Sequence, residues 1–198
     1  MESRSVVLCG VGGQGIILAS EIISEALFRH GFDVKKNEIH GMSQRGGSVV
    51  SFIRFGKKIY SPVVTQGEAD ILMSFEQLEM LRNLNYLKPD GHIVTTDIHI
   101  DPVPVILGTA KYPVDFTGPA HAKTKYYCVL DVETATREVG NIKAINVLVI
   151  GYLSHLLPEV KETLWQKAIQ DMVKPEFREM NLKAFALGKK LACEYNPQ

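Results

Sequence analysis

The sequence predicts an α/β fold: a Rossmann-like, mostly parallel sheet with an antiparallel hairpin insertion and a helical C-terminal end. Three observations predict this class. A short apolar segment, residues 4–9, runs into a glycine-rich turn that a helical pattern follows. Further apolar segments of strand length alternate with helical patterns up to about residue 132. From residue 133 onward the pattern is helical throughout.

Length and composition predict one compact domain. The chain has 198 residues, of which 45% are hydrophobic, and this is enough to bury a core. Its 22 basic and 22 acidic residues balance, which argues against nucleic acid or an anionic membrane as the main partner. We therefore treat residues 1–198 as a single domain, with a sheet-forming part over about 1–132 and a helical part over about 133–198.

The first elements form a β-α-β pattern. After the strand at residues 4–9, Ile16–His30 is expected to be a helix that Gly31 caps. Its apolar positions recur at helical spacing: Ile16, Ala19, Ile23, Ala26 and Leu27. A second strand is expected at residues 32–39. Because the carboxyl ends of neighbouring parallel strands lie side by side, the loops after these two strands are expected to share one crevice.

Residues 48–64 predict the hairpin. Their side chains alternate with a period of two on both sides of Gly56 and Lys57, which is typical of two antiparallel strands joined by a tight turn.

The remaining segments complete the sheet and the helical end. Strands are expected at 69–75, 92–98 and 125–131, and helices at 76–87, 146–157, 160–172 and 175–193. The helix from residue 76 is expected to end at "KPDG", residues 88–91, and Pro158 and Pro175 separate the last helices.

The three cysteines, Cys9, Cys128 and Cys193, lie far apart in the sequence. They predict neither a disulfide framework nor a metal knuckle, and they fit a reduced cytoplasm. Cys9 and Cys128 fall in apolar strands, so we assign them to the core. The longest apolar run, residues 145–157, is shorter than the ~20 residues that cross a bilayer. We expect a buried helix there, and no signal peptide before the first strand.

The first candidate site is the loop "GVGGQG", residues 10–15. It satisfies G-x-G-x-x-G directly after a strand and at a helix start, where glycines let an anion approach the helix N–H groups. A dinucleotide site also requires an acid about 20 residues on, and Glu38 has a tolerable spacing but leads into an unusual loop. A nucleotide cofactor, another anion and a purely structural turn all remain open. The candidate residues are Gly10, Gly12, Gly13, Gln14 and Gly15.

The second candidate site is the loop "HGMSQRGG", residues 40–47. Arg45 offers a guanidinium fork beside the exposed backbone N–H groups of a glycine pair, and this chemistry suits a phosphate or a carboxylate. The alternative is that Arg45 pairs with a buried acid while the glycines shape the entry to the hairpin. The candidate residues are Gln44, Arg45, Gly46, Gly47 and Ser48.

Other polar and aromatic residues give weaker signals. Asp97, His99 and Asp101 could form a metal cluster, but alternating polar residues are more typical of the solvated side of a strand, and we assign no metal site. Trp165 and Phe185 are expected to pack in the core or at an interface. No residue stands out as catalytic.

Together the two loops carry a family resemblance. "GVGGQG" followed by "HGMSQRGGSVVSFIRFG" resembles the gamma-type subunits of the 2-oxoacid:ferredoxin oxidoreductases, most closely the indolepyruvate branch. The resemblance continues in order through "ADILMSFEQLEMLR", "LKPDGHIV", "NIKAINVLVIGYL" and "MNLKAFALGKKL", so it covers nearly the whole chain.

The resemblance implies a reaction that this chain cannot perform alone. The family decarboxylates a 2-oxoacid oxidatively, with coenzyme A and ferredoxin, and uses thiamine diphosphate with Mg²⁺ and iron–sulfur clusters. An iron–sulfur cluster needs four closely spaced cysteines, whereas this chain has three scattered ones. The thiamine diphosphate signature, G-D-G followed by paired asparagines, is also absent. A large partner subunit is therefore expected to hold these cofactors, with ferredoxin and coenzyme A as the further partners.

The expected role is thus that of a small, non-autonomous subunit acting on a 2-oxoacid, with indolepyruvate or another aryl pyruvate favoured. The two loops would bind an anion, for which we favour the phosphates of coenzyme A over the diphosphate of thiamine. Two alternatives belong to other classes. One is a stand-alone Rossmann-type oxidoreductase that uses NAD(P) or flavin, and the other is a nucleotide-responsive regulatory module.

Overall fold

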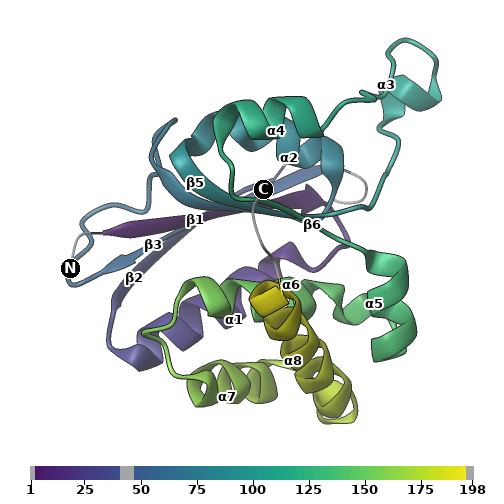
Figure 1. The fold of residues 1–198 in the computed structure, drawn as a ribbon. Helices are drawn as coiled ribbons and strands as arrows, with labels where there is room; N and C mark the ends of the chain where they lie inside the picture. Colours follow the sequence, from purple (N-terminus) through teal and green to yellow (C-terminus); the bar gives the residue numbers. More distant parts are fainter. Residues whose placement is uncertain (1–2, 41–46, 195–198) are drawn as a thin grey trace.

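The computed structural model describes residues 3–40 and 47–194, and within them a mixed sheet separates two layers of helices (Figure 1). The strand order is β2-β3-β1-β4-β5-β6. Strands β1, β4, β5 and β6 are parallel, whereas β3 is antiparallel to both β1 and β2. The bounds are β1 Arg4–Val11, β2 Asp33–His40, β3 Ser48–Gly56, β4 Ala69–Ser74, β5 Leu87–Thr96 and β6 Tyr127–Leu130. The predicted α/β class is confirmed.

The helices cover the two faces of the sheet unequally (Figure 1). One face carries α2 (Gln77–Asn83) and α4 (Thr117–Lys123). The other face carries most of the helical end, namely α1 (Ile16–His30), α5 (Val132–Val139), α6 (Ile145–Leu156), α7 (Glu162–Met172) and α8 (Arg178–Glu194). Short 3₁₀ turns lie at 84–86, 142–144 and 175–177, and α3 (Val103–Ile106) is a single turn in the connection from β5 to β6.

Helix α6 is the centre of the larger core. It is apolar on all sides, and its residues from Ile145 to Ser154 are buried. It contacts α8 backbone to backbone: a Cβ added at Gly151 would lie 2.1 Å from the Phe185 carbonyl oxygen, and one added at Gly188 would lie 1.9 Å from the Leu148 carbonyl oxygen. The two glycines therefore set the distance between these helices.

The predicted hairpin at residues 48–64 is wrong in its second half. Strand β3 ends at Gly56, and it pairs with β2 and β1 instead of with the segment that follows. In that segment Ile59 and Val64 are buried, but they lie five residues apart, so its burial does not alternate as it would in a strand. Its backbone bonds to side chains: Ile59 N–H donates to Asp33 (2.8 Å) and Arg54 donates to the Val63 carbonyl (2.8 Å). The residue pattern of this segment therefore does not correspond to a paired strand.

The first two strands were expected to be direct neighbours in the sheet, and this expectation is wrong. Strands β1 and β2 run in the same direction, but β3 lies between them. The loops that follow β1 and β2 still meet, because β3 begins at the edge of the sheet where β1 ends and Val11 pairs with Ser48.

"KPDG" lies inside β5 and does not end a helix. Helix α2 stops at Asn83, and β5 already begins at Leu87. The register between β4 and β5 shifts near this point, where Asp90 has a φ of 57°. A β-bulge accommodates the turn-like sequence within the strand.

Several core assignments are confirmed. Cys9 and Cys128 are buried, and so are Trp165 and Phe185. No helix within residues 3–40 and 47–194 is by itself long and apolar enough to cross a membrane, although the sharply bent pair 132–139 and 142–156 has the length and composition.

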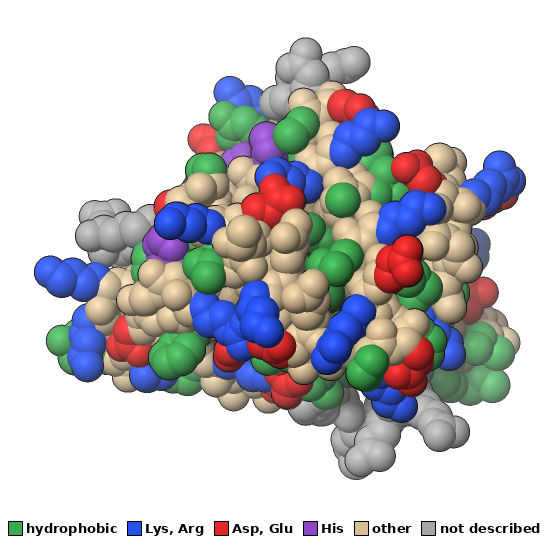
Figure 2. All heavy atoms as spheres, turned by 90° about the horizontal axis from the view of Figure 1, so that it is seen from below, with side chains coloured by type: hydrophobic (Ala, Val, Ile, Leu, Met, Phe, Trp, Pro, Cys, Tyr) green, Lys and Arg blue, Asp and Glu red, His purple; other side chains and the backbone are tan. Residues whose placement is uncertain are grey.

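The surface of the helical layer mixes charges. Figure 2 shows this face from below, with acidic and basic side chains interspersed and hydrophobic ones scattered. Arg29 and Lys167 both pair with Asp171, at 2.9 and 3.1 Å. Exposed pairs of this kind contribute little to stability, so this layer is held by its core.

Candidate functional site

The two predicted loops meet at one edge of the sheet. The backbone N–H of Gly12 donates to the carbonyl of Gly47 at 2.8 Å. Gln44, Arg45 and Gly46 lie outside the described residues. Of the second loop, the structure thus places Gly47 and Ser48 beside the glycine loop, and the binding role of the whole set stays a prediction.

The side chain of Gln14 stabilises the glycine loop by two hydrogen bonds to the backbone. Its Oε1 accepts from the N–H of Val11 at 2.7 Å, and its Nε2 donates to the carbonyl of Phe75 at 2.6 Å. Both ends of the amide are therefore used by the protein itself. A Cβ added at Gly10 would lie 2.8 Å from Gln14 Oε1, so this glycine makes room for the bridge.

Gly13 and Gly15 shape the turn into α1. Both have positive φ, 105° and 78°, where a side chain is strained. Gly15 is also the N-cap of α1, and its carbonyl accepts the first helical bond, from Ala19 at 2.9 Å. Helix starts leave N–H groups without helical partners, so this end of α1 suits a negative charge.

Ser48 is engaged by a buried acid. Its hydroxyl donates to Glu79 at 2.5 Å, and the other oxygen of that carboxylate accepts from Arg82 at 2.5 Å. Glu79 is only 2% exposed. This acid on α2 therefore anchors the start of β3.

A cavity of about 450 Å³ opens beside the glycine loop. Gly13, Gln14 and Gly15 form one wall, and Lys143 and Asn146 contribute the other polar groups. The rest of the lining is apolar: Leu18, Phe75, Ile98, Ile100, Ile142 and Ile145. The site thus combines a helix start and one lysine with a mostly apolar enclosure, as ligand sites commonly do.

The cavity continues toward the helical end. A second hollow of about 330 Å³ shares Leu18, Lys143 and Asn146 with the first and extends to Met172 and Phe177. Its lining adds a second lysine, Lys174. The two hollows are therefore adjacent, and Lys143 contributes to both.

The helical end contributes site residues that the local sequence pattern does not predict. Asn146 lies 131 positions from Gly15, yet its Nδ2 donates to the Gly15 carbonyl at 3.4 Å. Lys143 lies in the 3₁₀ turn before α6, and Asn146 is the second residue of that apolar helix. Nothing in local spacing links that segment to the loop.

Among the described residues near the site, the pKa values of Cys9 and Tyr112 depart from their usual range. Burial raises the pKa of the Cys9 thiol to about 12, so it stays protonated and donates to the Glu79 carbonyl at 3.4 Å. Burial and the hydrogen bond to Glu76 raise the pKa of Tyr112. Both groups therefore stay protonated at neutral pH and donate hydrogen bonds within the fold.

The side chains of Asp97, His99 and Asp101 do not come together as a metal site. They follow β5 and do not lie on it. Asp97 accepts from the N–H of Val132 at 3.0 Å, whereas His99 pairs with Asp101 at 2.7 Å. Within the described part of the chain, no group of three or more His, Cys, Asp or Glu side chains is placed to hold a metal ion.

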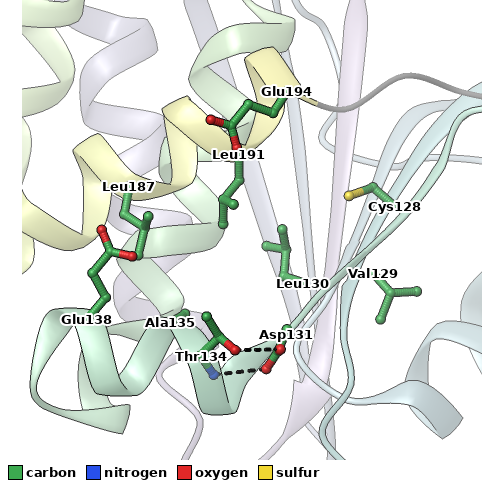
Figure 3. Close-up of a pocket in the computed structure, with 10 residues that line it drawn as sticks. All are labelled: Cys128, Val129, Leu130, Asp131, Thr134, Ala135, Glu138, Leu187, Leu191 and Glu194. Atoms are coloured by element: carbon green, nitrogen blue, oxygen red, sulfur yellow. Dashed lines mark hydrogen bonds between the residues drawn. The ribbon is translucent and has the colours of Figure 1, made fainter.

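A separate cavity of about 270 Å³ lies between β6, α5 and α8 (Figure 3). Cys128 and Leu191 contribute to its apolar lining, and three carboxylates border it: Asp131, Glu138 and Glu194. Asp131 caps α5 by accepting from the N–H and the hydroxyl of Thr134, at 2.9 and 2.7 Å. These acids do not suit an anion, so the glycine-loop cavity remains the candidate site.

The fold and this cavity define a class of protein: a Rossmann-like α/β domain whose glycine loop forms one wall of a mostly apolar site. The family model described as pyruvate ferredoxin/flavodoxin oxidoreductase matches residues 5–191. The chain belongs to this family, and the resemblance seen in its motifs is confirmed.

Individual relatives agree with the family. The indolepyruvate oxidoreductase subunit IorB of Thermococcus kodakarensis is 39% identical, over 98% of both chains. The gamma subunit of keto/oxoacid ferredoxin oxidoreductase from Geobacter sulfurreducens shares the fold with a TM-score of 0.70 and 24% identity, over 97% of this chain and 99% of that one. A 2-oxoglutarate:ferredoxin oxidoreductase from Magnetococcus marinus, solved with coenzyme A bound, gives a TM-score of 0.75 at 20% identity, over 100% of this chain and 32% of that longer one.

Proposed function

We propose that this chain is the small, beta-type subunit of an indolepyruvate:ferredoxin oxidoreductase, and that its glycine-loop cavity binds coenzyme A in the assembled enzyme. The observation that carries the assignment is the end-to-end similarity to an indolepyruvate oxidoreductase subunit, at 39% identity. The complex would convert an aryl pyruvate to the acyl-CoA and carbon dioxide, with reduction of ferredoxin.

The donor groups of this chain do not fit the redox cofactors of such an enzyme. Cys9 and Cys128 lie in different core clusters, one on each face of the sheet, and Cys193 is exposed. Three thiols so placed cannot ligate one iron–sulfur cluster. The proposal therefore assigns the clusters, the thiamine diphosphate and its Mg²⁺ to a large partner subunit. The free cysteines also fit a reduced cytoplasm.

The shape and chemistry of the cavity support coenzyme A as its ligand. Coenzyme A joins phosphate groups to a long, weakly polar arm. The start of α1 and Lys143 would attract phosphates, and the apolar lining with Phe75 and Ile98 would enclose the arm. A neighbour with the same fold was solved with coenzyme A. Arg45 would add a second cation from the second loop.

A dinucleotide-dependent dehydrogenase is the less favoured function. The acid that such a site requires would be Glu38, which lies on β2, separated from β1 by β3. Its carboxylate pairs with Lys36 at 2.8 Å and accepts from Ser20 at 3.2 Å. A ribose held at the glycine loop would therefore not meet this acid.

Kinetics of the reconstituted complex test the proposal. Arg45→Ala and Lys143→Ala should each raise the KM for coenzyme A about tenfold, the effect of one lost charge-assisted hydrogen bond. The KM for the 2-oxoacid should stay unchanged. Lys57→Ala is the control, because this exposed lysine follows β3 at the far edge of the sheet. Unchanged coenzyme A kinetics in both site variants would refute the cavity assignment and leave the family intact.

A further inference from the structure

The connection between β5 and β6 forms an arm, residues 101–116, that projects from the body of the protein (Figure 1). It exposes large hydrophobic side chains: Val103 is 64% exposed, Ile106 and Leu107 are each 70% exposed, and Val114 is 98% exposed. Isolated exposed hydrophobic residues are common, but several on one projecting element mark an interaction surface.

The arm has a defined structure of its own. The N–H groups of Ile106 and Leu107 donate to the carbonyls of Pro102 and Val103 at 3.1 and 2.9 Å, which makes the single turn α3. Thr109 donates to the Pro104 carbonyl through both its N–H (2.9 Å) and its hydroxyl (3.0 Å). Residues 102–110, which we call the knob, are thus held together by their own hydrogen bonds. The knob exposes the side chains of Val103, Ile106 and Leu107.

The base of the arm is fixed to the domain. The hydroxyl of Tyr112 donates to Glu76, which is 1% exposed and caps α2 by accepting from the N–H of Glu79 at 2.8 Å. The ring of Tyr112 stacks on His99, with 3.6 Å between centroids and 11° between planes. Glu76 also accepts from the N–H of Ile100 at 3.2 Å. These contacts attach the base of the arm to Glu76 and His99 and so fix the direction in which the knob projects.

The charge distribution indicates what the knob would contact. Residues 102–110 contain no charged side chain, whereas 22% of the chain is charged. The helical face in Figure 2 instead mixes both signs of charge. An uncharged, hydrophobic knob is complementary to an apolar pocket on another protein, and a charged or nucleic-acid surface would gain nothing from it.

The position of the arm indicates which protein supplies that pocket. Ile98 and Ile100, immediately before the arm, line the glycine-loop cavity, and so does Phe75, the neighbour of Glu76. A chain that covers the cavity must therefore lie against the base of the arm. Under the proposed function, that chain is the large subunit.

We propose that the arm inserts Val103, Ile106 and Leu107 into an apolar pocket of the large subunit and so anchors it over the glycine-loop cavity. This inference rests on the proposed function. A stable interface buries about 800 Å² on each partner, more than one knob provides, so the arm acts as an anchor within a contact that includes the cavity rim.

Titration of the purified large subunit with this chain tests the arm. The combined variant Val103→Ser, Ile106→Ser, Leu107→Ser should weaken binding at least tenfold, while the unfolding midpoint of the isolated chain stays unchanged because these side chains are exposed. Phe28→Ser is the matched control: it removes a side chain that is 66% exposed, but on α1. It should leave the binding constant unchanged.

The possible outcomes separate the two proposals. If the wild-type chain does not bind the large subunit, the proposed function fails and the arm proposal with it. If the wild type binds and the triple variant binds equally well, only the arm proposal is overturned. The arm proposal is also overturned if the triple variant abolishes self-association of the chain but still binds the large subunit normally, because the occupant is then a second copy.

Discussion

Gln14 and Phe75 are joined by a hydrogen bond of 2.6 Å, from the side-chain amide of Gln14 to the carbonyl that follows β4. This bond ties the glycine loop to the neighbouring strand and gives one wall of the cavity its shape. A residue that the sequence suggests as a ligand thus also has a structural role.

Gln14→Glu should destabilise the protein because a carboxylate oxygen would replace the donor that faces the Phe75 carbonyl. We expect the free energy of unfolding to fall by about 1–3 kcal/mol, the cost of an unpaired buried polar group, as measured by urea denaturation. Gln166→Glu is the control, since its amide donates to Glu162 at an exposed position. Equal losses in the two variants would contradict the structural role of Gln14.

Gly15→Ala should cost more stability than Gly13→Ala. Both substitutions place a side chain at positive φ, which costs about 1–2 kcal/mol. Only at Gly15 would the new Cβ meet a neighbour, Asn146 Nδ2 at 2.6 Å, whereas Gly13 faces open space. Asn146→Ala should recover part of the Gly15→Ala loss and none of the Gly13→Ala loss. A double-mutant cycle measured by chemical denaturation checks this, and a coupling of zero would refute the contact.

Gly188→Ala should be strongly destabilising although alanine is the better helix former. Helix propensity alone would stabilise α8 by about 1 kcal/mol. The added Cβ, however, would meet the Leu148 carbonyl oxygen at 1.9 Å and force α6 and α8 apart. We expect a loss of about 3 kcal/mol or more in thermal or urea unfolding. Lys190→Ala, at an exposed position on α8, should change little, and a neutral Gly188→Ala would contradict the close helix contact.

His92 should make stability depend on pH. Burial, with a smaller effect from Lys88, lowers the pKa of this histidine below its usual value of 6.5 in the folded state. The unfolded chain therefore binds a proton more readily, so stability is fully present above about pH 6.5 and decreases as the pH falls through the folded pKa. His92→Gln should flatten this dependence in unfolding experiments between pH 5 and 7.5. An unchanged slope would exclude His92 as its source.

Local signals explain what the sequence predicted well. Helix α1 spans the predicted Ile16–His30, because glycines with positive φ at both ends, Gly15 and Gly31, define its start and stop locally. The choice of strand partners is not local. The pairing of β3 with β1 and β2 could not be read from residues 48–64, because both partner strands lie elsewhere in the chain.

In the candidate site, too, the local features were predictable from the sequence and the long-range contacts were not. The motifs placed the glycine loop at a helix start, and the Gly12–Gly47 hydrogen bond joins it to the second loop. The far wall comes from Lys143 and Asn146, which only tertiary packing brings to the loop. The internal use of Gln14 was also invisible, because its partner Phe75 lies 61 positions away.

Reconstitution of the enzyme from its separated subunits tests whether this chain is a necessary subunit of an indolepyruvate:ferredoxin oxidoreductase. Reduction of ferredoxin with indolepyruvate and coenzyme A would be measured for the large subunit alone, for this chain alone and for the mixture. We predict no turnover by either subunit alone and coenzyme A-dependent turnover by the mixture. Full activity of the large subunit alone, or tight NADH binding or a flavin spectrum of this chain alone, would contradict the account.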